Sequence, residues 1–309
     1  MHSNKSENFM SCSLIDHDLI FDIFDRSNFY AQKDFFPLGE KTGNIIGGVF
    51  LQKSLRTLLS FKRSAIALGC DFVETSSISE SSEYFKDELR ELIEYSSIYF
   101  KSVILRSSLN LTAEKEFKDI FDASPVPIIS AGIGSLEHPT AALNLLFCIW
   151  GELGRKEGIS IAVVSKKSSR VGNSLALLIR KFSSCNICFF SEYPEIIEKN
   201  FLVIDPNFTS YKSYNILNYS LDKTNLCEYD VILIDENYSD YNYKATHLEE
   251  KGLFFYINEK IDNSLPLILH AKPILKAVGP GLIETVRRLS KKASCRSIST
   301  RTAILERLI

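Results

Sequence analysis

The stretch Ala131–Asn144 (A-G-I-G-S-L-E-H-P-T-A-A-L-N) decides how this chain is interpreted. Two glycines punctuate a loop, a His-Pro-Thr step follows, and an apolar helical pattern begins at once. Pro139 suits the first helical position, where its missing N–H costs nothing, and Thr140 can help to cap the helix. The spacing therefore predicts that His138 stands at the start of a helix. A histidine at such a strand-to-helix junction is typical of α/β active sites, with an ordinary capped loop as the equal alternative.

The composition indicates a globular protein with a full apolar core. The chain has 309 residues, of which 45% are hydrophobic, and a formal net charge of -2. One large or two medium domains fit this length, and the overall charge indicates neither nucleic acid nor a membrane surface as a partner. No apolar run reaches the ~18 residues of a membrane span, and no signal peptide is evident. Scattered cysteines fit reduced thiols, so we expect a cytoplasmic protein.

Short apolar runs alternate with longer helical patterns from Gly43 onward. The runs predicted as strands are Ile45–Leu51, Asp71–Thr75, Ser102–Leu105, Val126–Ser130, Ile159–Val164, Ile187–Phe190, Phe201–Ile204, Val231–Ile234, Phe254–Ile257 and Leu267–Leu269. Helical spacing fills Ser54–Gly69, Glu83–Tyr99 and the segment after Thr140. Val- and Ile-rich runs separated by helices predict parallel sheets covered on both faces. The predicted fold class is α/β, with two doubly wound parallel-sheet domains.

Three other segments favour structural interpretations. Cys185 and Cys188 form a C-x-x-C, but no second pair or suitably spaced histidine accompanies them, so core packing is expected and not a metal or redox site. The basic, then amphipathic, segment Ser290–Ile309 lacks interleaved aromatic residues and predicts a solvated basic face, not a nucleic-acid surface. The polar stretch Glu74–Lys86 predicts a mobile surface loop that enters a helix.

A candidate phosphate site follows the first predicted strand. Ser54 can cap the next helix, whose first N–H groups and dipole favour an anion. Arg56 adds a planar donor fork suited to phosphate, and Thr57 adds a hydroxyl. Taken alone, the S-x-R-T pattern is more often only the start of a helix.

Five segments, in order along the chain, resemble the aspartate/ornithine carbamoyltransferase family, with the greater overall similarity to its aspartate group. The sequence Q-K-S-L-R-T-L-L-S-F (52–61) resembles the family's S-T-R-T-R-x-S-F signature, and the opening stretch resembles A-G-D-G-x-x-x-H-P-T-Q-A-L. V-I-L-R (103–106), G-I-S-I-A-V-V (158–164) and R-T-A-I-L-E-R-L-I (301–309) match further landmarks. The resemblance implies a carbamoyl-phosphate-binding domain over 1–148, an acceptor domain over 149–289, and a C-terminal helix over 290–309 that packs back on the first domain.

The resemblance implies an enzyme that moves the carbamoyl group of carbamoyl phosphate to an amine, without a metal or cofactor. Arg56, Arg106 and His138 are the implied catalytic residues. Arg106 would contact the phosphate and carbamoyl oxygens, and His138 would polarise the carbonyl. The implied carbamoyl-phosphate-binding residues are Ser54, Leu55, Arg56, Thr57, Arg106, His138 and Pro273.

In the acceptor domain, the chain resembles the aspartate group at some positions and the ornithine group at others. Arg170 aligns with an arginine that binds the acceptor's carboxylate, whereas Asp235 and Ser239 match residues that hold the ammonium group of ornithine. The implied acceptor-binding residues are Arg170, Asp235, Glu236, Ser239 and Lys272. His270 and Pro273 fall on the loop whose backbone carbonyls receive the amine. Ser77 matches a serine inserted by a neighbouring subunit, which implies a homotrimer with shared active sites.

Departures from the family pattern leave two hypotheses open. Ala141 replaces a glutamine, and the lysine expected after Ser77 is absent, its position being Ser81. Glu236 replaces the carboxylate-binding arginine of the aspartate group, so a like charge would repel aspartate there. Each missing transition-state donor is typically worth ~10²–10³ in rate. The favoured hypothesis is a working but divergent transferase with an aspartate-like or ornithine-like acceptor; the alternative is an impaired relative with a binding, regulatory or scaffolding role.

Overall fold

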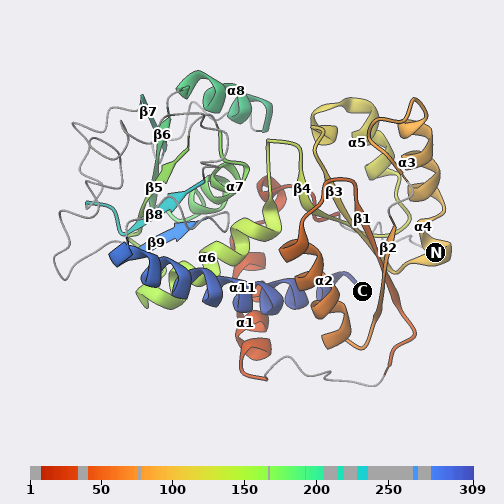
Figure 1. Cartoon of the computed structure of the whole chain (residues 1–309), viewed down its shortest axis with the longest axis horizontal. Coiled ribbons are helices and arrows are strands. Elements are labelled where there is room, and N and C mark those ends of the chain that lie inside the picture. Colours follow the sequence, from red (N-terminus) through yellow and green to blue (C-terminus); the bar gives the residue numbers. More distant parts are fainter. Residues whose placement is uncertain are drawn as a thin grey trace. The chain divides into compact units, whose positions relative to one another are not determined.

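The computed structural model describes residues 8–33, 41–75, 78–165, 168–191, 193–204, 214–218, 228–235, 267–270 and 280–309. The chain divides into two compact units. Unit 1 comprises Met1–Phe147 and Ser294–Ile309, and unit 2 comprises Cys148–Ala293. Each unit is built on its own parallel sheet (Figure 1). Among the described residues, no helix combines the length and apolarity that a membrane span needs.

The sheet of unit 1 has four parallel strands in the order β2-β1-β3-β4. They are β1 (Ile45–Phe50), β2 (Asp71–Thr75), β3 (Ser102–Ser107) and β4 (Ile128–Ile133). The chain leaves β1 for β2 on one side and returns to β3 on the other side. The carboxyl ends of β1 and β3 therefore form the topological switch point, the place where open α/β sheets bind ligands.

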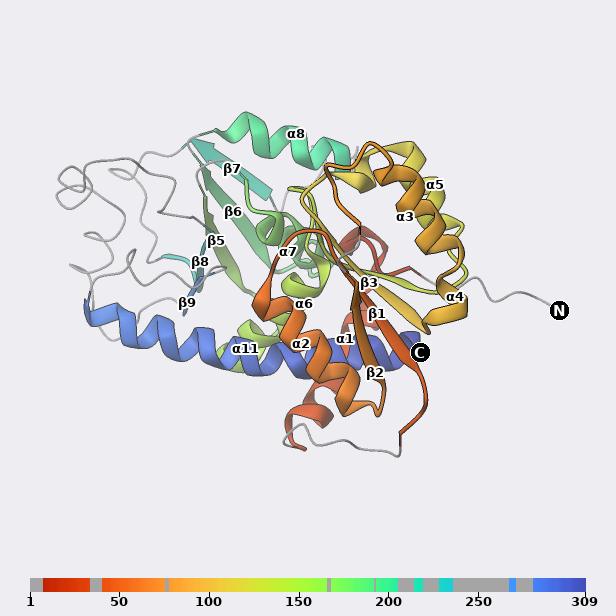
Figure 2. The same cartoon turned by 45° about the vertical axis from the view of Figure 1, so that its right-hand side comes forward.

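Helices cover both faces of this sheet (Figures 1 and 2). They are α1 (His17–Ala31), α2 (Leu55–Ala67), α3 (Phe85–Glu94), α4 (Ser96–Tyr99), α5 (Lys115–Asp122), the start of α6 (Pro139–Leu153) and the end of α11 (Pro280–Leu308). Helices α3 and α5 share an apolar core with the sheet, which includes Leu89, Val103 and Phe121. On the opposite face, the Ser64 hydroxyl donates to the Ile298 carbonyl (3.0 Å) and so joins α2 to α11.

The sheet of unit 2 has the strand order β7-β6-β5-β8-β9. Its strands are β5 (Ser160–Val164), β6 (Asn186–Ser191), β7 (Tyr214–Asn218), β8 (Val231–Ile234) and β9 (Leu267–His270). Helix α7 (Arg170–Ile179) follows β5, and α8 (Pro194–Ile204) follows β6. The direction reverses between β5 and β8, so this unit has its own switch point at the carboxyl ends of those two strands.

The predicted α/β class with two doubly wound parallel sheets is confirmed, but one predicted strand is wrong. Phe201–Ile204 is the last turn of α8. Ile197 and Phe201 stand four residues apart and are both buried, and the Phe201 ring packs against Phe189 with centroids 5.5 Å apart. The apolar run therefore continues a helical face. Strand β7 was not predicted, and the predicted strand Phe254–Ile257 lies outside the described residues.

Two structural interpretations of sequence motifs agree with the geometry. Cys185 and Cys188 are each only 2% exposed, as expected for core residues. Lys291 and Lys292 are exposed on α11, as expected for a solvated face. The same helix buries Arg301, which no sequence motif marks as a site residue.

Candidate functional site

The end of β4 and the loop that follows it have a backbone conformation that glycine adopts most readily. Gly132 and Gly134 have φ angles of +98° and +60°. A Cβ on Gly132 would lie 3.0 Å from the His138 ring and 3.1 Å from Arg106 Nη1. A Cβ on Gly134 would lie 1.9 Å from the Asn110 side-chain oxygen. The two glycines therefore let the loop close tightly against its neighbours at the carboxyl edge of the sheet.

His138 directly precedes α6 and is only 6% exposed. Its carbonyl accepts hydrogen bonds from the backbone N–H groups of Ala141 and Ala142, both at 3.1 Å, so its position is tied to the first turn. Its Nε2 lies 3.4 Å from Arg106 Nη1. Because a guanidinium only donates, a hydrogen bond here requires a neutral imidazole with its proton on Nδ1. His138 is thus arranged to donate from Nδ1.

Arg106 lies near the end of β3 and is 7% exposed. Its Nη1 donates to the Ala131 carbonyl (2.8 Å), and its own carbonyl accepts from Leu51 N (2.9 Å). The backbone of Arg106 is therefore fixed beside the end of β1, and its side chain is fixed against the backbone of β4. The switch point of unit 1 thus places a buried guanidinium beside His138.

The first turn of α2 stands directly after β1. The Ser54 hydroxyl donates to Thr57 Oγ1 (2.9 Å), and Thr57 is 7% exposed. The predicted capping by the Ser54 side chain is wrong, because this hydroxyl makes no hydrogen bond with a backbone N–H of the helix. Arg56 lies near the surface, yet burial lowers its pKa. Leu55 is 71% exposed and could contact a ligand only through its backbone.

A third guanidinium lies against α2. Arg301 of α11 is 5% exposed, and its Nη1 donates to the Ser60 hydroxyl. Its guanidinium carbon lies 4.8 Å from the centroid of the Phe61 ring. Burial, with the positive charges of Arg106 and Arg56, lowers the pKa of Arg301 to about 9. Among the described residues, no carboxylate forms an ion pair with Arg301.

These three arginines place like charges near the switch point of unit 1, since the charges of Arg56 and Arg106 both act on Arg301. Like charges in a partly desolvated place repel, since the protein screens them less than water does. A bound anion offsets that repulsion and can accept hydrogen bonds from guanidinium groups. The amino-terminal end of α2 adds backbone N–H donors and a favourable dipole to the same region.

The switch point of unit 2 combines an arginine with an aspartate. Arg170 is the first residue of α7, and Asp235 directly follows β8. The Ser169 hydroxyl accepts from Gly172 N (2.8 Å) and donates to the Asp235 carboxylate. Burial lowers the pKa of Arg170, and the charge of Asp235 opposes that effect. This edge therefore presents charges of both signs.

The chain is similar to known proteins over most of its length. Residues 7–150 match the model of the aspartate/ornithine carbamoyltransferase carbamoyl-phosphate-binding domain. The aspartate carbamoyltransferase catalytic subunit of Methanocaldococcus jannaschii is 28% identical, over 88% of this chain and 87% of the relative. The catalytic subunit from Thermoplasma volcanium is 25% identical over 99% of both chains. Residues 7–150 thus resemble the carbamoyl-phosphate-binding domain of the aspartate/ornithine carbamoyltransferase family, and nearly the whole chain is similar to aspartate carbamoyltransferase catalytic subunits.

Solved structures of family members share the fold. The catalytic subunit of the M. jannaschii aspartate transcarbamoylase superposes with a TM-score of 0.76 at 25% identity, over 97% of this chain and 98% of that one. The Trypanosoma cruzi enzyme in complex with carbamoyl phosphate gives 0.72 at 21% identity, over 97% and 94% of the two chains. The family resemblance predicted from sequence motifs is confirmed, together with the fold that it implied.

The segment after β2, where the family pattern led us to expect a lysine, is anchored to the end of β3. Glu80 accepts hydrogen bonds from the Ser107 hydroxyl, from Ser108 N (2.7 Å) and from the Ser108 hydroxyl. Burial favours the protonated carboxyl, but hydrogen bonds from Ser107, Ser108 and Leu109 outweigh it and lower the pKa of Glu80. The stretch predicted as a mobile loop is thus held at Glu80 within its own chain.

Some candidate residues of the family pattern are not described by the structure. Ser77, Glu236, Ser239, Lys272 and Pro273 lie outside the described residues. His270 ends β9, and only its backbone is described. The residues placed at the two switch points are Ser54, Arg56, Thr57, Arg106 and His138 in unit 1, and Arg170 and Asp235 in unit 2.

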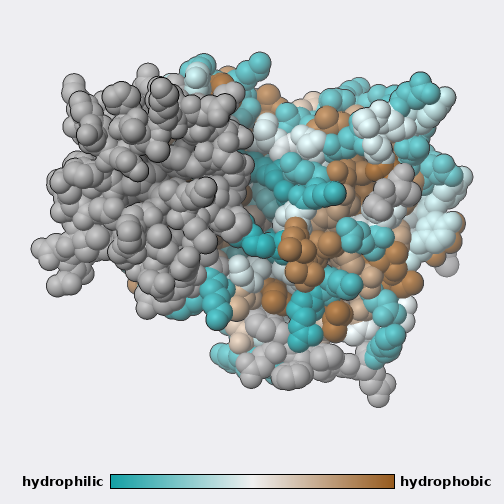
Figure 3. Space-filling view, viewed as in Figure 1, coloured by the Kyte–Doolittle hydropathy of each residue, from teal (hydrophilic) through white to brown (hydrophobic). Residues whose placement is uncertain are grey.

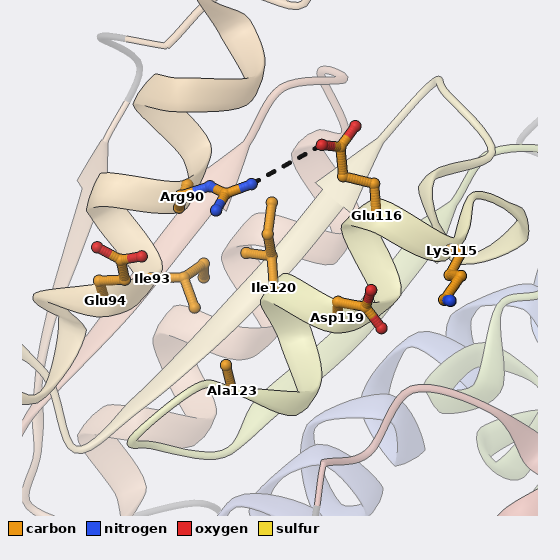
Figure 4. Close-up of a pocket in the computed structure, with 8 residues that line it drawn as sticks. All are labelled: Arg90, Ile93, Glu94, Lys115, Glu116, Asp119, Ile120 and Ala123. Atoms are coloured by element: carbon orange, nitrogen blue, oxygen red, sulfur yellow. Dashed lines mark ion pairs between the residues drawn. The ribbon is translucent and has the colours of Figure 1, made fainter.

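A pocket of about 470 Å³ lies elsewhere on unit 1, between α3 and α5 (Figure 4). Its lining residues are Arg90, Ile93, Glu94, Lys115, Glu116, Asp119, Ile120 and Ala123. Arg90 forms a 3.8 Å ion pair with Glu116 across it. None of the candidate site residues lines this pocket, so it is separate from the switch point.

Proposed function

We propose that this chain is a carbamoyltransferase that moves the carbamoyl group of carbamoyl phosphate to the amine of an amino acid and releases phosphate. The observation that carries the proposal is the gathering of Arg56, Arg106 and Arg301 at the first turns of α2, beside His138. The names of the relatives, which are aspartate carbamoyltransferases, support the same reaction.

The phosphate group is held by the amino-terminal end of α2. Backbone N–H groups of the first turn, the Arg56 guanidinium and the hydroxyls of Ser54 and Thr57 supply donors for its oxygens. Charge-assisted hydrogen bonds of this kind are about twice as strong as neutral ones. They also stabilise the charge that the phosphate gains as it leaves.

The carbamoyl carbonyl is polarised by Arg106 and by the Nδ1–H of His138. The acceptor nitrogen uses its lone pair to form a bond to the carbonyl carbon, and the bond from that carbon to the phosphate oxygen breaks. The bonding electron pair leaves with the phosphate, which also takes a proton from the nitrogen. Positioned donors lower the barrier because the carbonyl oxygen gains negative charge in the transition state.

The acceptor is an amino acid whose carboxylate pairs with Arg170. The relatives name aspartate as the first candidate. Asp235, joined to the cap of α7 through Ser169, adds a negative charge beside Arg170. That charge favours an acceptor that also carries an ammonium group, as ornithine does, so aspartate-like and ornithine-like amino acids form the class to test.

A second candidate function is phosphate or carbamoyl-phosphate binding without transfer. Ala141 offers no side-chain donor in the first turn of α6, where the family pattern has a glutamine. Ser81 stands where a lysine was expected, and its neighbour Glu80 is engaged by Ser107 and Ser108. Loss of both donors would slow transfer more than it would weaken anion binding.

The family resemblance further leads us to propose a homotrimer. Helix α2 carries an exposed apolar stripe of Leu55, Leu59 and Ile66, and Val73 is exposed on the edge strand β2. Apolar side chains are visible at the surface over α2 (Figure 3). Contiguous apolar surface of this kind supports burial against a second copy of the chain. Light scattering of the purified protein measures the oligomeric state directly.

Phosphate release across a panel of amino acids tests the proposed reaction. We expect release that depends on carbamoyl phosphate and on one amino-acid class, with aspartate and ornithine as the first two compounds. Tight carbamoyl-phosphate binding without turnover on any amine would exclude transfer and favour the binding function. An Arg56→Ala variant that binds carbamoyl phosphate as tightly as the wild type would overturn the site assignment.

A further inference from the structure

We propose that Arg301 is a positioning residue of the phosphate site: it orders the first turns of α2 through Ser60 and adds a positive charge that a bound phosphate dianion offsets. This inference rests on the proposed function, because it concerns the same anion site. It assigns a functional part to the C-terminal segment of α11, which the motifs had marked only as a terminal helix.

A continuous set of hydrogen bonds joins Arg301 to the phosphate-binding turn. Arg301 Nη1 donates to the Ser60 hydroxyl, which donates to the Thr57 carbonyl (2.8 Å). The Thr57 hydroxyl accepts from Ser54 (2.9 Å). Ser60 can make both bonds because a hydroxyl is donor and acceptor at once. Arg301 is therefore linked through Ser60 to the backbone of Thr57, whose hydroxyl is one of the two proposed to contact phosphate.

The charge environment of Arg301 differs from that of other arginines on the same face of unit 1. Arg26 pairs with Glu306, and Arg307 donates to Asp22 (2.7 Å), so both have carboxylate partners. The charged groups that act on Arg301 are Arg56 of α2 and Arg106 of β3, which are both positive. In the described part of the chain, its Nε also lacks a hydrogen-bond partner.

A purely structural role does not explain this placement. Burial of an unpaired charge is costly, and an apolar side chain of similar volume would fill the space against Phe61 without that cost. A site that must bind an anion explains it, because the ligand supplies the missing negative charge. Residues kept for function often reduce the stability of the unliganded protein in this way.

The test compares Arg301→Met, Arg301→Lys and the surface control Arg307→Met by calorimetric titration with inorganic phosphate and with carbamoyl phosphate. We expect roughly 10- to 100-fold weaker binding for the Met variant at position 301, since one of three nearby positive charges is lost. The Lys variant, which keeps the charge, should recover most of that loss. The control, whose ion pair with Asp22 is exposed, should bind like the wild type.

A further measurement separates positioning from structural support. The phosphate-free Arg301→Met protein should melt no lower than the wild type, because the substitution removes a buried charge that has no carboxylate partner among the described residues.

The outcomes distinguish the two proposals. A wild-type protein that binds neither phosphate nor carbamoyl phosphate would overturn the proposed function and this inference together. A wild type that binds both, with an Arg301→Met variant that binds equally well, would overturn the inference alone. Equal loss in the Met and Lys variants, accompanied by lower melting temperatures, would show that Arg301 only supports the fold.

Discussion

The two switch points of this molecule share a topology and differ in charge. In unit 1, the ends of β1 and β3 gather Arg56 and Arg106, and Arg301 adds a third positive charge. In unit 2, the ends of β5 and β8 place Arg170 near Asp235, so the positive charge has a negative neighbour. The first arrangement suits a dianion, and the second suits a molecule with charges of both signs.

In both units the strand order sets where the candidate site lies, and the side chains at that place determine which kind of ligand can bind. Both sheets reverse direction beside their first strand, and in both the residues after that strand lead into a helix. The helix ends favour anions equally, because the backbone dipoles do not depend on sequence. The carboxylate of Asp235 is therefore the feature that makes the second site different.

The largest effect is expected from a substitution of Arg106 at the unit 1 switch point. Arg106→Met should weaken carbamoyl-phosphate binding and slow phosphate release by at least about 10³-fold, because it removes a buried guanidinium that we propose contacts both the phosphate and the carbamoyl group. Calorimetric titration and a phosphate-release assay measure the two effects. A loss below tenfold would show that Arg106 does not contact the ligand.

The matched substitution in unit 2 is Arg170→Met. We expect the KM for the acceptor to rise about 30- to 100-fold, since one charge-assisted hydrogen bond to a carboxylate is worth about 2–3 kcal/mol. The Kd for carbamoyl phosphate should stay within twofold of the wild type. Equal damage to both constants would mean that the two switch points do not bind separate ligands.

A smaller effect is expected from a substitution of Asp235, which makes the charge of the unit 2 switch point more like that of unit 1. Asp235→Asn removes the negative charge near Arg170 and should shift the ratio of kcat/KM for aspartate over ornithine about 5- to 10-fold toward aspartate. The amide can still accept a hydrogen bond from Ser169, so the cap of α7 should persist. An unchanged ratio would show that Asp235 acts only on the fold.

The smallest effect concerns the segment anchored at Glu80. The pKa of the Glu80 carboxyl is lower in the folded protein than the ordinary value of 4.5. Ionised Glu80 therefore stabilises the folded protein at pH values above 4.5. This contribution should disappear as pH falls through the lowered pKa. Glu80→Gln should cost about 0.5–1 kcal/mol at neutral pH and nearly nothing in acid, as measured by urea unfolding at several pH values. A constant difference at every pH would contradict the hydrogen-bonded carboxylate.

Much of the fold could be predicted because buried parallel strands read as apolar runs. Val231–Ile234 and Asp71–Thr75 were predicted with the boundaries that the structure shows. Phe201–Ile204 was misread because a short apolar run looks alike in a strand and in the buried face of a helix. Its four-residue spacing from Ile197 was the signal that could have corrected the prediction.

The site was only partly predictable, for a different reason. Arg56, Arg106 and His138 stand beside strands and helix starts, so local patterns mark them. Arg301 reaches the same place from the end of the chain, and only tertiary packing brings it against Ser60. Its one sequence signal is a charge among small and apolar residues on a helix, S-T-R-T-A-I-L, where a buried face is expected.

Gly134 limits the mutational routes open to this protein. A side chain there would meet the Asn110 side chain at 1.9 Å and the Asn110 Cα at 2.7 Å. Shortening Asn110 would remove the first obstacle and leave the second, because every amino acid has a Cα. No single substitution at position 110 can therefore create space for a side chain at position 134. Replacement of Gly134 requires a change in the backbone of one of the two loops as well.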